Sequence, residues 1–213
     1  MINNNIMLNS INFREIYMGE IAPKTLYRSS HPIFNGRQVK DIIFSVNNAK
    51  IKTIINLSDS FDSIKAKVNS CPWYKELLEG NNVKALNMDM NFDIMQKKFA
   101  EKVNLGIRFM IEHDPPYLIH CQAGIDRTGL LSIILESFMG ACFEDIAKDY
   151  CLSFNDQKTG TVFVYNLFSK LKSELKYSKD DLSELSTRYL MQKTGLNLNE
   201  LVQLKTKLRN ISI

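Results

Sequence analysis

The sequence predicts an α/β fold in which a parallel-rich central sheet is flanked by helices, with additional helices at the carboxyl terminus. Two observations carry this prediction. Up to about residue 140, short apolar runs typical of strands alternate with segments of helical periodicity, whereas only helical patterns follow. Such alternation is typical of parallel strands whose two faces are both covered by helices.

Four short runs rich in apolar and β-branched residues predict the strands of this sheet. They are residues 25–29 (TLYRS), 51–57 (IKTIINL), 83–88 (VKALNM) and 117–121 (YLIHC). The last two are bounded by residues that favour turns. The sequence therefore predicts at least four strands, separated by enough chain to form crossover connections.

Residues 94–113 predict a long amphipathic helix between the last two strands. Apolar side chains recur on one face of it, at Phe99, Val103, Ile107 and Met110. Asp93 precedes Gln96 by three residues, and this spacing predicts a capping box at the start of the helix. Two prolines after Asp114 are expected to end it.

The remainder of the chain predicts helices alone. A buried helix is expected over residues 128–140, followed by helices over roughly 143–153, 161–176, 179–194 and 198–209. No internal repeat and no Pro- or Gly-rich linker divides the sequence. We expect one domain over residues 1–213, with a core of about 10–155 and a helical carboxyl-terminal extension of about 156–213.

Composition and charge exclude several classes of function. The 27 basic and 23 acidic residues give a net charge of +4 and are mixed along the chain, unlike the basic stripe of a nucleic-acid-binding protein. Four cysteines without C-x-x-C spacing argue against a zinc or dithiol redox site. No apolar run reaches the roughly 18 residues of an integral membrane segment. The amino terminus lacks the pattern of a cleavable signal, so we expect a cytoplasmic protein, although export without such a signal is compatible with the sequence.

The decapeptide HCQAGIDRTG, residues 120–129, joins the last predicted strand to the buried helix. A strand, a tight loop and a helix amino terminus together form an anion site, because backbone N–H groups and the positive end of the helix dipole converge there. The loop lacks the lysine of a nucleotide P-loop. The residues expected to bind a phosphate group are Gln122, Ala123, Gly124, Ile125, Asp126 and Arg127.

Three side chains of this loop predict covalent chemistry. Cys121 lies among N–H donors, an arginine and a helix amino terminus, and these surroundings favour the nucleophilic thiolate form. Arg127 offers a planar fork that matches two phosphate oxygens. Thr128 is placed to donate a hydrogen bond to the sulfur and to ease its departure when a covalent intermediate breaks down. The alternative for Cys121 is a buried structural thiol, and the alternative for Arg127 is an ordinary salt bridge.

The loop resembles the signature H-C-x-x-G-x-x-R-[ST]-G of the cysteine-dependent protein tyrosine and dual-specificity phosphatase superfamily, and every fixed position matches. The aspartate directly before the arginine makes the loop similar to that of the atypical bacterial and fungal tyrosine phosphatase branch. The flanking segments INFREI, LYRSSHP, KTIINLSD, DIAKDYCLSFND and RYLMQKTGLNLNELVQL are similar to motifs of the same branch. Ile125 stands where lipid-active relatives often have lysine.

The resemblance implies hydrolysis of phosphomonoesters through a phosphocysteine intermediate, without a metal or another cofactor. Phosphorylated proteins, above all those with phosphotyrosine, are the leading substrates, and dual specificity is compatible with the same loop. A phosphoinositide or inositol phosphate substrate is the alternative. A different class of function is a catalytically inactive phosphate-binding module, which would keep the loop without turnover. The sequence does not determine the oligomeric state.

Three aspartates compete for the role of general acid. The resemblance places the acid after the strand that precedes the long helix, about thirty residues before the cysteine. Asp89, which is 32 residues before Cys121, is the first choice. Asp126, inside the loop, is the second choice for an acid or assisting role, or else orients the arginine, and Asp93 is explained as a helix cap.

Two further residues near the strands have weaker predictions. His120 either supports the loop from below or is an ordinary core histidine. Arg28, in the LYRSSHP segment, is expected to form a structural salt bridge.

Overall fold

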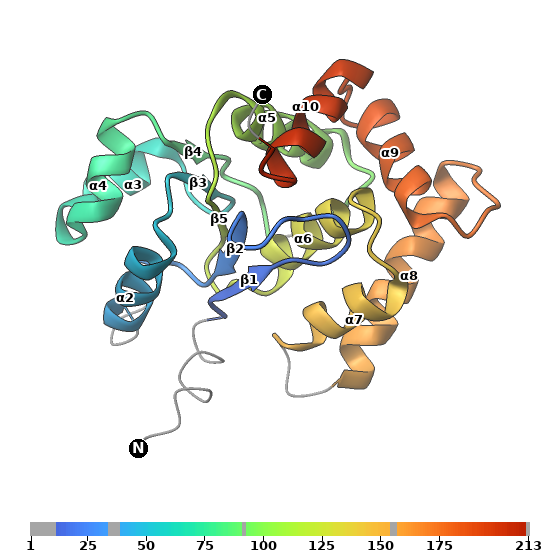
Figure 1. The fold of residues 1–213 in the computed structure, drawn as a ribbon, viewed down its shortest axis with the longest axis horizontal. Coiled ribbons are helices and arrows are strands. Elements are labelled where there is room, and N and C mark those ends of the chain that lie inside the picture. Colours follow the sequence, from blue (N-terminus) through green and yellow to red (C-terminus); the bar gives the residue numbers. More distant parts are fainter. Residues whose placement is uncertain (1–11, 34–38, 91–92, 154–156, 212–213) are drawn as a thin grey trace.

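The computed structural model describes residues 12–33, 39–90, 93–153 and 157–211, and its central feature is a five-stranded sheet (Figure 1). The strand order is β1-β2-β5-β3-β4. The strands are β1 (Arg14–Ile16), β2 (Leu26–Ser29), β3 (Thr53–Asn56), β4 (Val83–Ala85) and β5 (Tyr117–His120). All neighbours are parallel except β1 and β2, which are antiparallel. The parallel-rich sheet is therefore confirmed, and β1 is an additional strand that the sequence did not predict.

Alternating side chains of the strands point into two separate apolar layers. Ile119 and Ile55 belong to one buried cluster, whereas Leu118 and Ile54, their neighbours in sequence, belong to the other. The second layer is covered by three helices, α2 (Val39–Ala49), α3 (Phe61–Lys67) and α4 (Pro72–Glu79), with the short 3₁₀ helix η2 (Val68–Ser70) between the last two. The alternation of strands with helical segments predicted helices between these strands, but their positions were not predicted from the sequence.

The other face of the sheet packs against two predicted helices, α5 (Lys97–Glu112) and α6 (Asp126–Phe138). The later helices pack on these two or on one another, and they are α7 (Phe143–Cys151), α8 (Gln157–Glu174), α9 (Leu182–Gln192) and α10 (Leu198–Leu208). Every residue of α6 from Arg127 to Phe138 is buried, because the sheet, α7 and α9 all pack against it. The buried helix and the four helices after it are confirmed.

The start of α5 differs from the prediction. Its amino-terminal cap is Gln96, which makes no side-chain hydrogen bond to the helix, so the predicted capping box is wrong. Asp93 instead accepts a hydrogen bond from the Met95 N–H at 2.9 Å and pairs with Lys170 Nζ at 2.7 Å. A short aspartate side chain readily forms such a local turn, which competes with helix formation.

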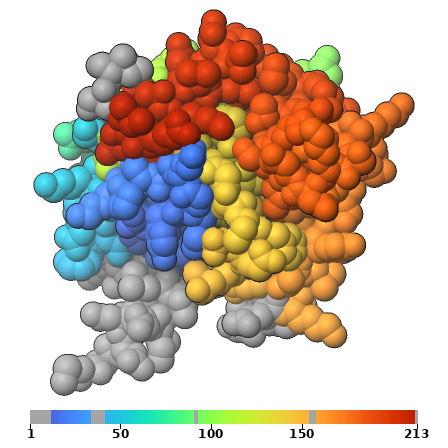
Figure 2. Space-filling view, turned by 45° about the vertical axis from the view of Figure 1, so that its right-hand side comes forward, coloured from blue at the N-terminus to red at the C-terminus, as the bar shows by residue number. Residues whose placement is uncertain are grey.

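The carboxyl-terminal helices pack directly on the amino-terminal hairpin. In Figure 2 the segment that joins β1 to β2, in blue, lies beside α10, in red. The Ala22 N–H donates to the Leu208 carbonyl oxygen at 2.9 Å, and the Glu20 N–H donates to the Met139 carbonyl oxygen at 2.8 Å. One apolar cluster runs from Ile16 in β1 to the last residue of α10. The helical tail is therefore part of the same packing that supports the sheet.

Candidate active site

The predicted phosphate loop leaves the carboxyl end of the central strand β5 and leads directly into α6. Gly124 has a φ of +72°, and a Cβ atom there would lie 2.5 Å from the Ser29 carbonyl group. A Cβ atom on Gly129 would lie 2.4 Å from the ring of Tyr150. Both glycines are required by close approach, one between the loop and β2 and the other between α6 and α7.

Cys121 lies at the base of this loop and is only 2% exposed. In the same loop, Arg127 Nη1 donates to the Met88 carbonyl oxygen at 2.9 Å, while Arg127 Nε is buried without a described partner. Thr128 Oγ1 is likewise buried and has no partner among the described residues. Buried donors without acceptors are rare in folded proteins, and a loop built to bind an anion accounts for both.

The carbonyl oxygens of the loop are turned outward. The Gln122 oxygen accepts the His31 N–H at 3.1 Å, the Ala123 oxygen accepts Asn12 Nδ2 at 3.0 Å, and the Gly124 oxygen accepts Arg28 Nη2 at 2.9 Å. Because the N–H and C=O groups of a planar trans peptide point in opposite directions, outward carbonyls direct the following N–H groups inward. The loop therefore has the form of an anion-binding nest at a helix amino terminus.

His120, the last residue of β5, is fully buried and neutral. Tyr74 Oη accepts a hydrogen bond from Asn56 Nδ2 at 3.1 Å and lies 3.1 Å from His120 Nε2, so we assign the tyrosine hydroxyl as the donor to this nitrogen. Burial, assisted by the neighbouring His31, lowers the pKa of His120 well below its ordinary value. The histidine thus acts as an uncharged acceptor at neutral pH.

A second histidine, paired with an aspartate, was not predicted as part of the site. His31 Nε2 lies 2.7 Å from Asp59 Oδ2, and its Nδ1 accepts the Ile33 N–H at 3.1 Å. Burial alone would raise the pKa of Asp59, but hydrogen bonds from His31 and Ser58 hold it well below the usual range. The ring centroids of His31 and His120 are 4.7 Å apart, which places the pair against the base of the loop.

The three candidate acids have different surroundings. Asp89 is exposed and directly follows Met88, whose carbonyl oxygen accepts Arg127 Nη1, so the structure brings the Asp89 segment to the loop. Asp126 is exposed on the first turn of α6. Asp93 is occupied by Lys170 and by the turn at Met95. Asp89 and Asp126 therefore remain the candidates, and Asp93 is set aside.

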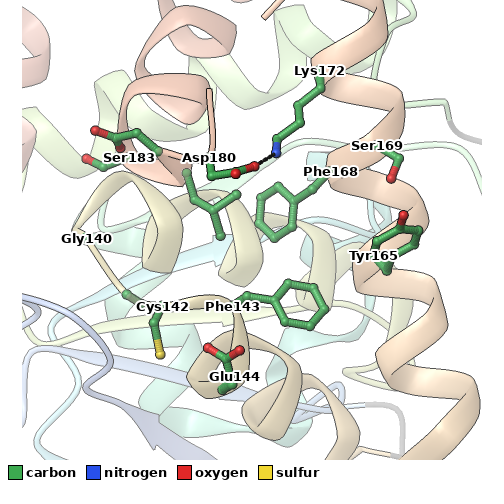
Figure 3. Close-up of a pocket in the computed structure, with 13 residues that line it drawn as sticks. Gly140, Cys142, Phe143, Glu144, Tyr165, Phe168, Ser169, Lys172, Asp180 and Ser183 are labelled. Atoms are coloured by element: carbon green, nitrogen blue, oxygen red, sulfur yellow. Dashed lines mark hydrogen bonds and ion pairs between the residues drawn. The ribbon is translucent and has the colours of Figure 1, made fainter. Parts of the chain in front are cut away.

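A cavity of about 740 Å³ lies away from the loop, between helix α8, the turn that follows α6 and the starts of α7 and α9 (Figure 3). Its lining includes Phe143 and Phe168, together with the carboxylates of Glu144, Asp180 and Asp181. Lys172 is paired with Asp180 at 2.6 Å. These carboxylates would repel a phosphate group, and no predicted site residue lines the cavity. The phosphate loop is therefore the better anion site.

The described ranges contain neither a cluster of metal ligands nor a helix able to cross a membrane. No group of three or more His, Cys, Asp or Glu side chains within them is arranged to hold a metal ion. Within the same ranges, no helix combines the length and the apolar character that a bilayer crossing requires.

Comparisons with known proteins agree with the signature loop. The sequence profile of a family described as the tyrosine phosphatase family matches residues 9–210. Two solved structures of the Siw14 catalytic core, one of them the core catalytic domain of the PP-IP phosphatase SIW14 from S. cerevisiae in complex with citrate, are 19% identical and cover 78% of this chain and 93% of theirs, with TM-scores of 0.47 for the citrate complex and 0.48 for the other. No curated protein matches. Since the profile spans nearly the whole chain, the protein belongs to the tyrosine phosphatase family and is a cysteine-dependent phosphatase.

Proposed function

We propose that the protein hydrolyses phosphotyrosine in proteins through a phosphocysteine intermediate. In the first step the Cys121 thiolate attacks phosphorus, the S–P bond forms, and the bond from phosphorus to the tyrosine oxygen breaks. Asp89 donates its proton to that departing oxygen, so tyrosine leaves as a neutral phenol. Arg127 and the inward N–H groups of the loop hold the three equatorial oxygens.

The second step restores the enzyme. Water attacks the phosphocysteine, and Asp89 or Asp126 accepts its proton while the S–P bond breaks and inorganic phosphate forms. The Thr128 hydroxyl donates a hydrogen bond to the departing thiolate. No step of this sequence requires a metal ion or another cofactor.

One observation carries the proposed chemistry: the buried thiol shares its loop with buried donors that have no partner among the described residues. Arg127 Nε and Thr128 Oγ1 would each leave a hydrogen bond unmade in the described structure, at a cost of about 1–3 kcal/mol for each group. A phosphoryl group bound on Cys121 supplies acceptors for both. An inactive phosphate-binding module would explain the arginine but leaves the thiol and the threonine without a role.

The surroundings of the loop support an aryl phosphate as the substrate. Because Cys121 is almost completely buried, its phosphate must arrive at the end of a side chain, and that of phosphotyrosine extends further than that of phosphoserine. Ile125, which is partly exposed on the loop, offers an apolar contact for an aromatic ring. An inositol phosphate carries several phosphate groups and would favour a cation at this position.

A substrate panel tests this proposal. In the presence of a metal chelator, kcat/KM is measured for a phosphotyrosine peptide, the matched phosphoserine peptide, phosphoinositides in micelles and soluble inositol phosphates. We expect the phosphotyrosine peptide to be the best substrate, and Ile125→Lys to shift the preference towards the multiply phosphorylated compounds. Higher kcat/KM for an inositol phosphate with the unaltered protein would contradict the substrate class, and no turnover of any substrate would contradict the phosphatase reaction.

A further inference from the structure

Three sequence motifs that lie far from the signature loop meet on its outer side. Asn12 and Arg14 come from the INFREI segment, Arg28 comes from LYRSSHP, and Asp149 comes from DIAKDYCLSFND. We propose that these four residues form a loop collar, which fixes the loop carbonyl oxygens outward and thereby keeps the N–H groups turned towards the phosphate. The collar is a set of positioning residues, and its role rests on the proposed function of the loop.

Arg28 is the centre of the loop collar. It is fully buried on β2, and its Nη2 donates to the carbonyl oxygens of Gly124 at 2.9 Å and Ile125 at 3.4 Å. Its Nη1 donates to Asp149 Oδ2 at 2.9 Å. The salt bridge expected from the sequence is confirmed, but the same guanidinium also binds the loop. A lysine has no planar fork and would not reproduce both contacts.

Asp149 holds Arg28 in place from α7. Its carboxylate also accepts Arg14 Nε at 2.8 Å, and Arg14 Nη2 donates to the Asp149 carbonyl oxygen at 2.8 Å. Burial would raise the pKa of Asp149, but the two arginines outweigh this effect and lower it. Buried ion pairs are on average weak contributors to stability, because desolvation offsets their attraction. Positioning of the loop therefore explains this buried network better than a contribution to stability does.

Asn12 completes the loop collar at a second carbonyl group. Its side chain is 6% exposed, and its Nδ2 donates to the Ala123 oxygen at 3.0 Å. Its φ of +49° lies in the left-handed region that asparagine and glycine tolerate best. An asparagine here satisfies both the backbone conformation and the hydrogen bond.

The loop collar has a chemical consequence that packing alone does not have. If a carbonyl group loses its outer donor, the peptide is able to rotate, and an oxygen with partial negative charge then faces Cys121 in place of an N–H. Such a rotation disfavours both the thiolate and a bound phosphate. Loss of the collar is therefore expected to weaken phosphate binding and to slow the reaction of the Cys121 thiol with an alkylating reagent.

The sharpest test uses Asn12, because its side chain is not a member of the buried ion pairs, although Arg14 Nη1 donates to its Oδ1 over a long 3.5 Å. Asn12→Gly removes the amide and suits the positive φ, whereas Asn12→Asp keeps the size and the acceptor for Arg14 but adds a charge and has no N–H to donate. Calorimetry measures binding of inorganic phosphate, and the rate of iodoacetamide alkylation at a fixed neutral pH follows Cys121 in a Cys142→Ser background, since Cys142 is an exposed thiol. We expect roughly five- to tenfold weaker phosphate binding, as for the loss of one hydrogen bond, and slower alkylation.

Arg28→Lys is expected to give the larger change of the same kind, with thermal melting used to verify that the variant folds. If it does not fold, the two Asn12 variants decide the question. Arg209→Gln is the matched control, because Arg209 forms an exposed ion pair with Glu20 and does not contact the loop. Unchanged phosphate affinity and alkylation in both Asn12 variants would overturn the loop collar. Neither measurement requires turnover, so the two proposals can fail separately. A protein that turns over no substrate would refute the phosphatase proposal, yet weaker phosphate binding in its Asn12 variants would still support the collar.

Discussion

The phosphate loop and the segment that carries Asp89 face each other across the candidate site, but they are held very differently. The loop carbonyl oxygens are bound by buried groups from several elements. The Asp89 segment is held through its backbone, by Arg127 at the Met88 oxygen and by the Asp59 oxygen at the Asn87 N–H. The Asp89 side chain itself is exposed and has no hydrogen-bond or ion-pair partner in the described part of the chain.

This difference matches the demands of the proposed reaction. A nucleophile and its phosphate cradle gain from a fixed geometry, because the charge of the transition state develops in one place. A general acid must meet leaving groups of different shape, and an exposed side chain on a backbone-anchored segment is able to do so. We therefore infer that the site combines a rigid phosphate cradle with an adjustable acid.

The largest effect that separates the two regions is expected from Asp89→Asn. Loss of general acid catalysis should lower kcat by roughly 10²–10⁴-fold for a poor leaving group such as tyrosine. The loss should shrink for a phenol that is already a stable anion, and the basic limb of the pH profile should flatten. The measurement is kcat/KM across phenyl phosphates of graded leaving-group pKa.

Asp126→Asn is the matched control for this series. If Asp126 only orients the loop, its variant should weaken all phenyl phosphates about equally, because they share one phosphate cradle. A steep dependence on the leaving group in the Asp126 variant, together with a flat one in the Asp89 variant, would transfer the acid role to Asp126.

A smaller effect is expected from Arg127→Lys, which alters the side-chain hydrogen bond that joins the two regions. Lysine keeps the charge but lacks the planar fork for two phosphate oxygens and for the Met88 carbonyl group. We expect kcat/KM to fall by about 10²–10³-fold, as for the loss of one preorganised transition-state donor. Near-normal kcat/KM for the lysine variant would refute the assignment of this arginine.

The smallest effect concerns stability and involves Glu136, a buried residue of α6 beside Arg28 and Asp149. Burial and the nearby Asp149 charge raise the pKa of Glu136 well above its ordinary value, so the folded protein keeps a proton that the unfolded chain loses above about pH 4.3. Its contribution to stability is therefore present below that pH and is lost as the pH rises towards the folded pKa. Glu136→Gln stays neutral and should remove this loss.

Urea unfolding at pH 5 and pH 8 measures this prediction. The lowered pKa of Asp149 keeps that residue ionised throughout this range, so it does not add to the change. The free energy of unfolding of Glu136→Gln, minus that of the unaltered protein, should be larger at pH 8 than at pH 5. An equal difference at both pH values would show that Glu136 does not hold its proton.

The sequence predicts best those parts of the molecule whose characteristic residues lie close together along the chain. The loop is predictable because its chemistry needs neighbouring residues from Cys121 to Thr128, and the tail helices because their apolar faces repeat over several turns. The three-residue β1 contains two charged residues and has no alternation to detect. The helices α3 and α4 span only 7 and 8 residues, and the apolar run in α2 is also compatible with a strand.

The supporting residues of the site were missed because they come together only through the strand order. His31 follows β2 and Asp59 follows β3, and these two strands flank β5 on opposite sides. Both residues follow the carboxyl ends of parallel strands, where ligand sites form, and that position was the available signal. The contacts of Asn12 and Arg28 with the loop depend on the neighbouring β1 and β2, which no local pattern reveals.

The most direct test of the central claim is to trap the covalent intermediate. A phosphotyrosine peptide is mixed with the protein, the reaction is stopped in acid within the first turnover, and the digested protein is analysed by mass spectrometry. We predict one phosphoryl group on the peptide that contains Cys121, and none after Cys121→Ser, which should still bind inorganic phosphate. Turnover of the substrate without phosphate on Cys121, or turnover retained by the serine variant, would contradict the phosphocysteine mechanism.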